Sequence, residues 1–341
     1  MELRDALEHI IARRDLDRAQ SRALFDQVLG GTLTPGQIGG LLTALATKGE
    51  TAQEIAGAAE AMRERSAKVH TTAQPLVDTC GTGGSGAKLF NISTAAAFVT
   101  AAAGAAVAKH GNRKMTSSSG SADVLEAAGA KLTLSPEQIG RCVEELGIGF
   151  MFAQAHHSAM RHAGPVRQEL GVRTLMNILG PMTNPAGARR QVMGVFAADR
   201  LQLVAQVLAL LGSERAMVVH SEGLDEIRLD APTQVVELKD GELRSYTVTP
   251  EDLGLSSRSV DELRAGTVEN SLKLLRTSLT EPDSAAAEIV ALNAGAAIYV
   301  AGLASSHKLG VAMAADAIAA GLAQERFREF VKTTELMSEQ T

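Results

Sequence analysis

The sequence predicts an α/β fold in which a small helical domain is joined to a larger α/β domain with a mainly parallel central sheet. Two observations support this prediction. The first part of the chain shows helical patterns only, whereas short apolar runs alternate with longer helical segments from residue 76 onward. The chain also has 341 residues, more than one small core usually accommodates, so a second domain is expected.

Residues 1–70 are expected to form the helical domain. Apolar residues recur at helical spacing near the N-terminus, and two later helices have clear starting signals. Thr34 precedes a proline, and Thr51 stands three residues before a glutamate as in a capping box. A helical segment and loop at about 166–190 is expected to return to this domain. The α/β domain is therefore predicted to span 71–341.

The strands of the second domain are expected to be short, because each is read from a run of apolar residues between turn signals or helical patterns. Helical segments separate these runs, and the chain from about residue 284 onward is expected to be helical. This alternation is typical of a parallel sheet covered by helices. The strands are expected at 76–80, 105–109, 149–153, 191–196 and 216–221.

Composition and charge argue against several classes of protein. The formal net charge is −6, so the overall field does not favour nucleic acid, and the absence of Trp leaves few surfaces for base stacking. No apolar stretch follows a basic N-terminus, and no apolar run is long enough to span a membrane. Cys80 and Cys142 show no metal-ligand spacing and are expected to be reduced thiols of a cytoplasmic protein.

A glycine-rich loop, Gly81–Gly86, follows the first expected strand and precedes a helix. Glycine lets backbone N–H groups approach a phosphate closely, so this loop suggests phosphate binding. A dinucleotide fold would need an acidic residue about twenty positions later, and none stands there. A nucleotide-binding P-loop would need a lysine after the last glycine, where this chain has Ala87. A simple tight turn is the other alternative.

Two further segments bring donors that suit an anion. Asn91–Thr94 opens the next helix with hydroxyl side chains, which fits either an anion site or ordinary helix capping, or both. Lys109–Arg113 follows the second expected strand and places two cations, a histidine and an amide within five residues. Because α/β folds bind ligands at the carboxyl ends of their strands, this cluster and the hydroxyl-rich loop after it suit a diphosphate.

An adjacent carboxylate pair, Asp225 and Glu226, follows the last expected strand. Such a pair is usually a solvated loop. In the company of phosphate-binding segments it can instead bind Mg²⁺, which prefers a few carboxylates together with substrate oxygens.

Together these segments resemble the anthranilate phosphoribosyltransferase family, a relative of the nucleoside phosphorylases in architecture. The blocks GTGG, FNIST, KHGNR, SGSADVLEA, GPMTNP and GLDEI occur in this order, and the resemblance covers nearly the whole chain. It implies transfer of the phosphoribosyl group from 5-phosphoribosyl 1-diphosphate to anthranilate in tryptophan biosynthesis, giving N-(5-phosphoribosyl)anthranilate and diphosphate. It further implies Mg²⁺ as cofactor and a cytoplasmic homodimer formed through the helical domain.

The resemblance also implies roles for individual residues. Ser93, Asp225 and Glu226 correspond to magnesium ligands, and Lys109, His110 and Arg167 to catalytic residues. The Arg167 guanidinium can pair with the carboxylate of anthranilate. No general base is assigned, although His110 and His157 are candidates. The implied substrate-binding residues are Gly81, Gly84, Ser85, Leu89, Asn91, Ile92, Ser93, Thr94, Lys109, His110, Gly111, Asn112, Arg113, Ser117, Ser121 and Arg167.

The chain departs from the family pattern in the glycine loop. Ser85 stands where the family usually has aspartate, and Leu89 where it usually has threonine. Ser85 can accept a hydrogen bond but lacks the charge of aspartate, and Leu89 lacks the hydroxyl of threonine, so a higher Michaelis constant for phosphoribosyl diphosphate is expected.

Two other functions share this architecture. A pyrimidine nucleoside phosphorylase would not be expected to keep the KHGNR and GPMTNP blocks. A non-enzymatic nucleic-acid-binding relative would be expected to be basic and to lack the carboxylate pair, whereas this chain is acidic and keeps the pair.

Overall fold

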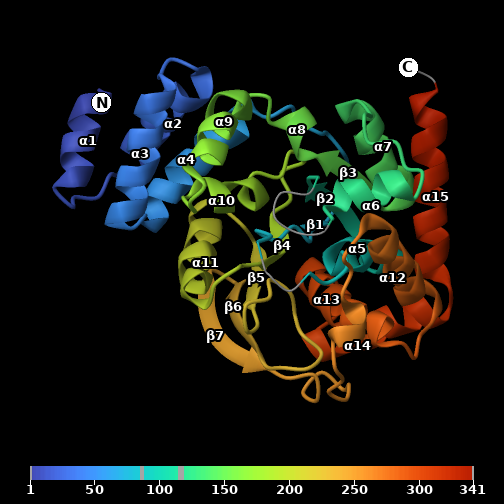
Figure 1. The fold of residues 1–341 in the computed structure, drawn as a ribbon. Coiled ribbons are helices and arrows are strands. Elements are labelled where there is room, and N and C mark those ends of the chain that lie inside the picture. Colours follow the sequence, from blue (N-terminus) through green and yellow to red (C-terminus); the bar gives the residue numbers. More distant parts are fainter. Residues whose placement is uncertain (1, 85–87, 114–118, 340–341) are drawn as a thin grey trace.

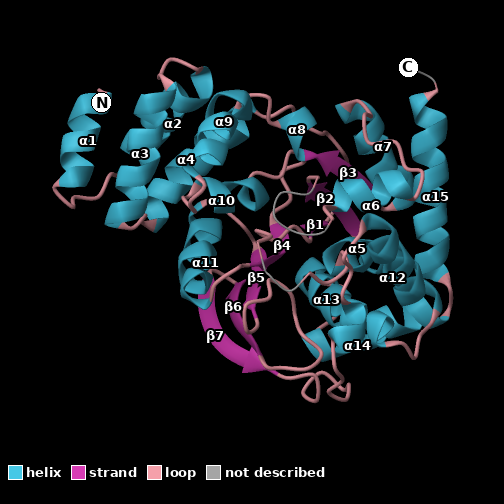
Figure 2. Cartoon of the chain, viewed as in Figure 1, coloured by secondary structure: helices cyan, strands magenta, loops and turns pink. Residues whose placement is uncertain are grey.

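The computed structural model describes residues 2–84, 88–113 and 119–339. A bundle of helices from the N-terminal part of the chain lies beside a central sheet, and further helices cover the sheet on its other side (Figures 1 and 2). The fold class expected from the sequence is confirmed, because a helical bundle is joined to an α/β unit with a mixed, mainly parallel sheet.

The N-terminal bundle begins its helices where the sequence signals predicted. The Thr34 hydroxyl accepts a hydrogen bond from the backbone N–H three residues later, and Thr51 does the same in a complete capping box. The glutamate of that box, Glu54, is fully buried. The helices are α1 (Leu3–Ile11), α2 (Arg18–Gly30), α3 (Pro35–Lys48) and α4 (Ala52–Arg65).

A later segment packs on this bundle. Helix α9 (Met160–Leu170) contacts α2 and α3, and the short α10 (Met176–Leu179) contacts α4. Side chains from both, such as Ala163 and Met176, share one hydrophobic core with α1–α4. The contacts arise because α9 turns its buried apolar residues toward the bundle.

The sheet has seven strands in the order β3-β2-β1-β4-β5-β6-β7. Its first five strands are parallel, and each lies within two residues of an expected strand at its start. The two final strands are antiparallel and form a hairpin that the sequence reading missed. The strands are β1 (Leu76–Asp78), β2 (Ala106–Gly111), β3 (Ile148–Phe152), β4 (Arg190–Gly194), β5 (Arg215–His220), β6 (Thr233–Lys239) and β7 (Glu242–Val248).

Both faces of the sheet are covered, which explains why its inner strands read as continuous apolar runs. In β5, Met217 and Val219 join the core formed with α5 and α13, while Ala216 and Val218 join the core formed with α11 and the bundle. The remaining helices are α5 (Ile92–Ala102), α6 (Ser121–Ala127), α7 (Pro136–Leu146), α8 (Ala153–His156), α11 (Leu201–Leu210), α12 (Val268–Thr280), α13 (Ala285–Ala301), α14 (His307–Ala319) and α15 (Leu322–Ser338).

The most apolar helix, α13, is buried in the protein core. It crosses α14 so closely that a Cβ atom on Gly310 would lie 2.2 Å from the carbonyl oxygen of Gly295. Among the described residues no single helix is long and apolar enough to cross a membrane, and α12 with α13 reaches that length only as a pair bent by 77°.

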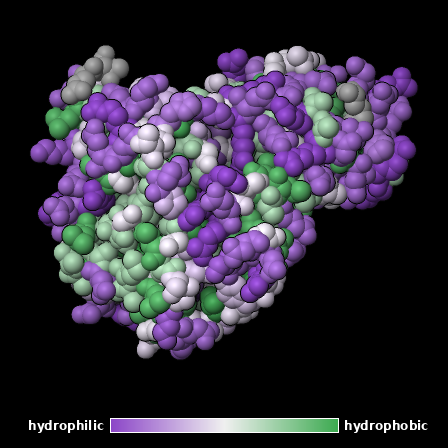
Figure 3. Space-filling model, turned by 180° about the vertical axis from the view of Figure 1, so that it is seen from behind, coloured by the Kyte–Doolittle hydropathy of each residue, from purple (hydrophilic) through white to green (hydrophobic). Residues whose placement is uncertain are grey.

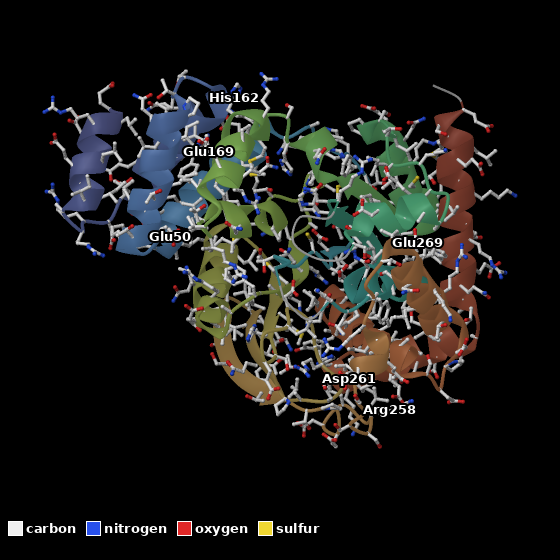
Figure 4. The ribbon with its side chains drawn as sticks, viewed as in Figure 1. Glu50, His162, Glu169, Arg258, Asp261 and Glu269 are labelled. Atoms are coloured by element: carbon white, nitrogen blue, oxygen red, sulfur yellow. The ribbon has the colours of Figure 1, made fainter. Side chains whose placement is uncertain are left out.

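Two ion pairs stabilise the bundle: one links it to α11, and the other is buried within it. Glu50, between α3 and α4, pairs with Arg200 at the start of α11 at 3.5 Å (Figure 4). Deeper inside, a carboxylate oxygen of Glu54 lies 3.0 Å from the ammonium group of Lys48, whose side chain is 4% exposed. The other oxygen accepts a hydrogen bond from the backbone N–H of Leu16 at 2.9 Å. Glu54 therefore joins α4 to α3 and to the α1–α2 loop.

We predict that Glu54→Ala lowers the free energy of unfolding by about 2–4 kcal/mol, because the N–H of Leu16 loses its buried acceptor and Lys48 keeps only its exposed carboxylate partner, Asp15. The matched control is Glu8→Ala, which removes an exposed pair with Arg4 and should change that energy by less than about 1 kcal/mol. Urea unfolding followed by circular dichroism measures both. Equal small losses for the two variants would show that the buried pair contributes nothing special.

Candidate active site

Four of the expected segments meet at the carboxyl edge of the parallel strands. The glycine loop follows β1, the Asn91–Thr94 segment begins α5, the KHGNR segment ends β2, and the carboxylate pair follows β5, all around the end of β4. A small cavity lies at this edge. It is lined by Thr79, Gly81, Ser93, Ala96, Val192, Gly194, Val219, Asp225, Glu226 and Asn293.

Two glycines allow the segments to touch. A Cβ atom on Gly194 would lie 1.6 Å from the carbonyl oxygen of Asp225, so no other residue fits at the end of β4. A Cβ atom on Gly81 would lie 3.1 Å from the carbonyl oxygen of Gly194 and 3.4 Å from a carboxylate oxygen of Asp225. The backbone N–H of Thr82 donates to the carbonyl oxygen of Gly194 at 2.8 Å. The glycine loop thus lies directly beside the carboxylate pair.

The two carboxylates of the pair are crowded together, and neither has an ion-pair partner in the described part of the chain. Burial, and then the charge of Asp225, raises the pKa of Glu226 to about 8, while Lys109 and the N–H and hydroxyl groups of Ser93 act in the opposite direction. A site with two crowded carboxylates and a nearby hydroxyl fits a hard divalent cation. No group of three or more His, Cys, Asp or Glu side chains suited to a metal exists among the described residues.

Lys109 supplies a buried positive charge close to this pair. Its side chain is buried, and its ammonium group donates to the carbonyl oxygen of Thr79 at 3.3 Å and to the Thr79 hydroxyl at 3.2 Å. It has no carboxylate partner within the described ranges, so part of its hydrogen-bonding capacity remains for an anion. The Thr79 hydroxyl in turn donates to the carbonyl oxygen of Ser93 at 3.1 Å.

A buried carboxylate and amide hold the strand that presents Lys109. The Asn184 side chain, from the GPMTNP block, donates to Asp78 at 2.7 Å and to the carbonyl oxygen of Ala108 at 2.8 Å. Asp78 also accepts from the backbone N–H of His110 at 3.2 Å. Burial raises the pKa of Asp78 to about 6. Through Asn184, the GPMTNP block therefore joins β1 to β2 beside the site, a role that its sequence did not reveal.

Two histidines pack behind the KHGNR segment. The rings of His110 and His157 lie 5.0 Å apart, and both side chains are buried. Burial lowers the pKa of His110 well below its usual value and that of His157 to about 4. The backbone of Gly180 acts in the opposite direction on the pKa of His110, but neither ring nitrogen makes a well-aligned hydrogen bond to a described residue. Both imidazoles are therefore neutral near pH 7, and neither stands out as the general base.

The predicted site residues at and just before the start of α5 differ in whether they make polar contacts or pack in the core. The Asn91 side chain is hydrogen-bonded to serines of two other segments. Ile92 packs in the core, and the buried hydroxyl of Thr94 has no partner in the described part of the chain. Leu89 packs against the same core and forms an isolated bridge with Arg264.

Gly111, Asn112 and Ser121 lie together at the start of α6. A Cβ atom on Gly111 would lie 2.2 Å from the Ser121 hydroxyl oxygen, and that hydroxyl donates to the carbonyl oxygen of Asn112 at 3.3 Å. Arg113 instead forms an ion pair with Glu126 and stacks on Phe152 with its guanidinium carbon 4.7 Å from the ring centre. Its role in substrate binding stays a prediction. Ser85 and Ser117 lie outside the described residues.

Two arginines near the end of α9 differ in their partners. Arg167 is half-buried, has no hydrogen-bond or ion-pair partner for its side chain among the described residues, and has its pKa lowered by burial. Arg173, which lies after α9 and was not among the predicted site residues, donates to the carbonyl oxygen of Gly84 at 3.1 Å. Its guanidinium carbon lies 4.1 Å from the ring centre of Phe196. It links the segment after α9 to the glycine loop.

Asn293 is a second residue that the sequence reading missed. It lies in α13 and is buried, where its amide oxygen accepts from the backbone N–H of Ile227 at 2.9 Å. Its amide nitrogen donates to the carbonyl oxygens of Ile227 and Ile289, each at 2.9 Å. Asn293 thereby fixes the loop that presents the carboxylate pair. A polar residue in the middle of a mostly apolar helix was the available signal.

Comparisons with known proteins cover nearly the whole chain. Residues 4–66 match the helical bundle domain of a glycosyl transferase family, and residues 73–324 match its a/b domain. An anthranilate phosphoribosyltransferase from Cellvibrio japonicus is 54% identical over 99% of this chain and 100% of that protein. One from Ectopseudomonas mendocina is 51% identical over 100% and 99%.

Solved structures of anthranilate phosphoribosyltransferases are also similar to this chain. The crystal structure of anthranilate phosphoribosyltransferase from Thermus thermophilus has a TM-score of 0.92 and 44% identity, covering 97% of this chain and 99% of that one. The enzyme from Saccharomyces cerevisiae in complex with PRPP and Mg has a TM-score of 0.87 at 22% identity, covering 98% of each chain, and supports the fold.

We predict that Asn293→Leu lowers the free energy of unfolding by about 2–4 kcal/mol, because it leaves buried N–H and C=O groups of Ile227 without partners. Asn270→Leu on α12 is the control, since Asn270 is exposed and its side chain has no partner within the described residues; it should change that energy by less than about 0.5 kcal/mol. Urea denaturation of both variants measures the difference. A loss no greater than the control's would mean that the loop does not depend on this amide.

Proposed function

The chain belongs to the anthranilate phosphoribosyltransferase family, and from this premise we propose how its residues carry out the reaction. The enzyme transfers the phosphoribosyl group from 5-phosphoribosyl 1-diphosphate to anthranilate in tryptophan biosynthesis. One observation supports the assignment of the site best: the glycine loop, buried Lys109 and the carboxylate pair meet at one edge of the sheet.

Phosphoribosyl diphosphate is proposed to bind across this edge. The glycine loop offers backbone N–H groups, and the start of α5 offers the positive end of a helix dipole to a phosphate. Lys109 has an ammonium group that is buried and only partly hydrogen-bonded, which suits the diphosphate. The residues proposed for this substrate are Gly81, Gly84, Ser85, Leu89, Asn91, Ile92, Ser93, Thr94, Lys109, Gly111, Arg113, Ser117 and Ser121.

Mg²⁺ is proposed to be held by Asp225, Glu226 and Ser93. The fit rests on the raised pKa of Glu226 and on the missing counter-charge among the described residues. Two carboxylates and a hydroxyl leave room for substrate oxygens, which Mg²⁺ commonly uses as ligands. When bound there, the ion would neutralise part of the charge of the diphosphate leaving group.

Anthranilate is proposed to bind between the α9 segment and the KHGNR segment, with contacts to Gly81, His110 and Asn112. Arg167 is half-buried and unpaired among the described residues, so the carboxylate of anthranilate would satisfy its charge. The aromatic amine is neutral at pH 7, so the protein's main task is to place it against C1 of the ribose. As the bond from C1 to the diphosphate breaks, Lys109 and loop N–H groups stabilise the charge on the leaving oxygens.

Direct turnover tests this assignment. The purified protein should consume anthranilate, measured as loss of its fluorescence, only when phosphoribosyl diphosphate and Mg²⁺ are both present. A nucleoside phosphorylase would instead split a pyrimidine nucleoside with phosphate. Phosphorolysis without anthranilate turnover would contradict the proposed function.

The helical bundle is proposed to include residues 1–70 together with about 166–190, and to form a homodimer. Ile11 on α1 is 72% exposed and Val172 after α9 is 55% exposed, so large apolar side chains remain on this part of the molecule. The surface seen from behind is otherwise mostly hydrophilic over the bundle (Figure 3). Sedimentation of Ile11→Glu against the parent tests the dimer, and an unchanged mass would remove Ile11 from the interface.

We predict that Asp225→Asn with Glu226→Gln abolishes turnover while the protein stays folded. The neutral side chains keep the size of the carboxylates and lack the charge that holds Mg²⁺. Steady-state rates are measured over a range of Mg²⁺ concentrations, with circular dichroism as the check on folding. The control changes a nearby exposed carboxylate, Glu222→Gln, and should retain parental rates. Near-normal turnover of the double variant at limiting Mg²⁺ would place the metal elsewhere.

We predict that removing each of two positively charged side chains weakens the use of a different substrate. Arg167→Ala should chiefly raise the Michaelis constant for anthranilate, and Lys109→Ala should chiefly impair the use of phosphoribosyl diphosphate. Each should lose about 2–4 kcal/mol in kcat/KM for its own substrate, since a charged group of that substrate loses its partner. Each variant serves as the control for the other. If Arg167→Ala affected only the diphosphate substrate, the two assignments would be reversed.

A further inference from the structure

Asn91 is held by a segment that lies far away in the sequence. Its backbone N–H donates to the hydroxyl of Ser271 at 3.1 Å, and the same hydroxyl donates to its amide oxygen at 2.7 Å. Ser271 is fully buried in the first turns of α12. The Ser271 hydroxyl is therefore hydrogen-bonded to both the backbone and the side chain of Asn91.

The directions of these hydrogen bonds follow from the groups involved. A backbone N–H can only donate, so the Ser271 oxygen accepts from it and uses its own proton toward the Asn91 amide oxygen. Ser119 donates its hydroxyl to that same amide oxygen at 2.7 Å. The carbonyl oxygen of Ser119 can only accept, and the Asn91 amide nitrogen faces it at 3.3 Å. These contacts allow only one orientation of the carboxamide.

This orientation leaves a donor for a ligand. The amide oxygen already accepts two hydroxyl protons, whereas the amide nitrogen has two hydrogens and donates one. The second hydrogen has no partner among the described residues. Asn91 is half-buried at the start of α5, beside the residues proposed to bind the diphosphate substrate.

The backbone around Asn91 is held from the same side. The N–H of Phe90 donates to the carbonyl oxygen of Leu263 at 3.1 Å, and the N–H of Ala265 donates to the carbonyl oxygen of Lys88 at 2.8 Å. The chain leading into α12 thus runs beside the end of the glycine loop. Asp261 and Glu269, labelled in Figure 4, flank this connection.

We propose that Ser271 is a positioning residue for phosphoribosyl diphosphate: through its hydroxyl it fixes Asn91 so that the Asn91 amide group presents a hydrogen-bond donor to the substrate. This inference rests on the proposed function, in which Asn91 contacts that substrate. Without the hydroxyl, the Asn91 N–H loses its acceptor and the amide oxygen loses one of two donors. The carboxamide can then rotate and present oxygen to a phosphate, which repels it.

The same helix provides a matched control. Ser278 is also fully buried in α12, and its hydroxyl donates only to the carbonyl oxygen of Leu275 in its own helix. Ser271→Ala and Ser278→Ala therefore remove equivalent buried hydroxyls, one of which contacts Asn91. Any general weakening of α12 should appear in both.

The test compares steady-state kinetics of Ser271→Ala, Ser278→Ala, Asn91→Ala and the double variant Asn91→Ala with Ser271→Ala. Ser271→Ala should raise the Michaelis constant for phosphoribosyl diphosphate roughly tenfold. Its kcat and its Michaelis constant for anthranilate should stay within about twofold, and Ser278→Ala should leave all three values near those of the parent. Because Ser271 acts through Asn91, the double variant should be no worse than Asn91→Ala alone.

Specific results would overturn the proposal. An unchanged constant for Ser271→Ala, or losses that multiply in the double variant, would show that Ser271 does not act through Asn91. If Asn91→Ala itself left the constant unchanged, the assignment of Asn91 to the substrate site would fail instead. Should Ser271→Ala not fold, Ser271→Cys provides the second variant, because a thiol of similar size is a weak donor and acceptor and should raise the same constant.

Discussion

Two adjacent carboxylates, Asp225 and Glu226, lie beside a glycine loop at the carboxyl edge of the sheet, and the neighbouring elements are arranged around this concentration of negative charge. Gly194 has no side chain because the backbone of Asp225 occupies that space, and a Cβ atom on Gly81 would lie 3.1 Å from the carbonyl oxygen of Gly194. Asn293, in α13, is hydrogen-bonded to the backbone of Ile227, the residue that follows the pair. Lys109, buried in β2, supplies the nearby positive charge that lowers the pKa of Glu226 against the effect of burial.

The rest of the site is built by segments that reach this edge from both faces of the sheet. Asp78 and Asn184 join β1, β2 and the loop before β4, and so fix the strand that presents Lys109. From the bundle side, α9 presents Arg167 and the following residues tether the glycine loop through Arg173. From the opposite side, α12 holds Asn91 through Ser271. The proposed substrates therefore meet residues at the edge of the sheet and on the bundle side, and the C-terminal helices hold some of these residues in place.

The sequence allowed prediction of the elements whose signals are local. Capping at Thr34 and Thr51 and the five parallel strands followed from short patterns, and the ordered blocks indicated the family. The hairpin of β6 and β7 was missed although its alternating residues and the Asp240-Gly241 turn are the usual signals, with positive φ at both. Asn184 and Ser271 could not be found this way, because each acts on backbone groups more than 60 residues away. Asn293 offered only its polarity within a mostly apolar helix, and its partner Ile227 is also more than 60 residues away.

The central claim is that the carboxylate pair and the glycine loop form a single site for phosphoribosyl diphosphate and Mg²⁺. Calorimetric titration of phosphoribosyl diphosphate with and without Mg²⁺, and of Mg²⁺ with and without that substrate, tests it most directly. Because the protein offers only a few groups that can coordinate Mg²⁺, substrate oxygens must complete its coordination. Mg²⁺ and phosphoribosyl diphosphate should therefore each bind at least tenfold more tightly when the other is present. The factor should be the same in both directions and corresponds to about 1.4 kcal/mol or more. Affinities that do not depend on the second ligand would contradict a shared site.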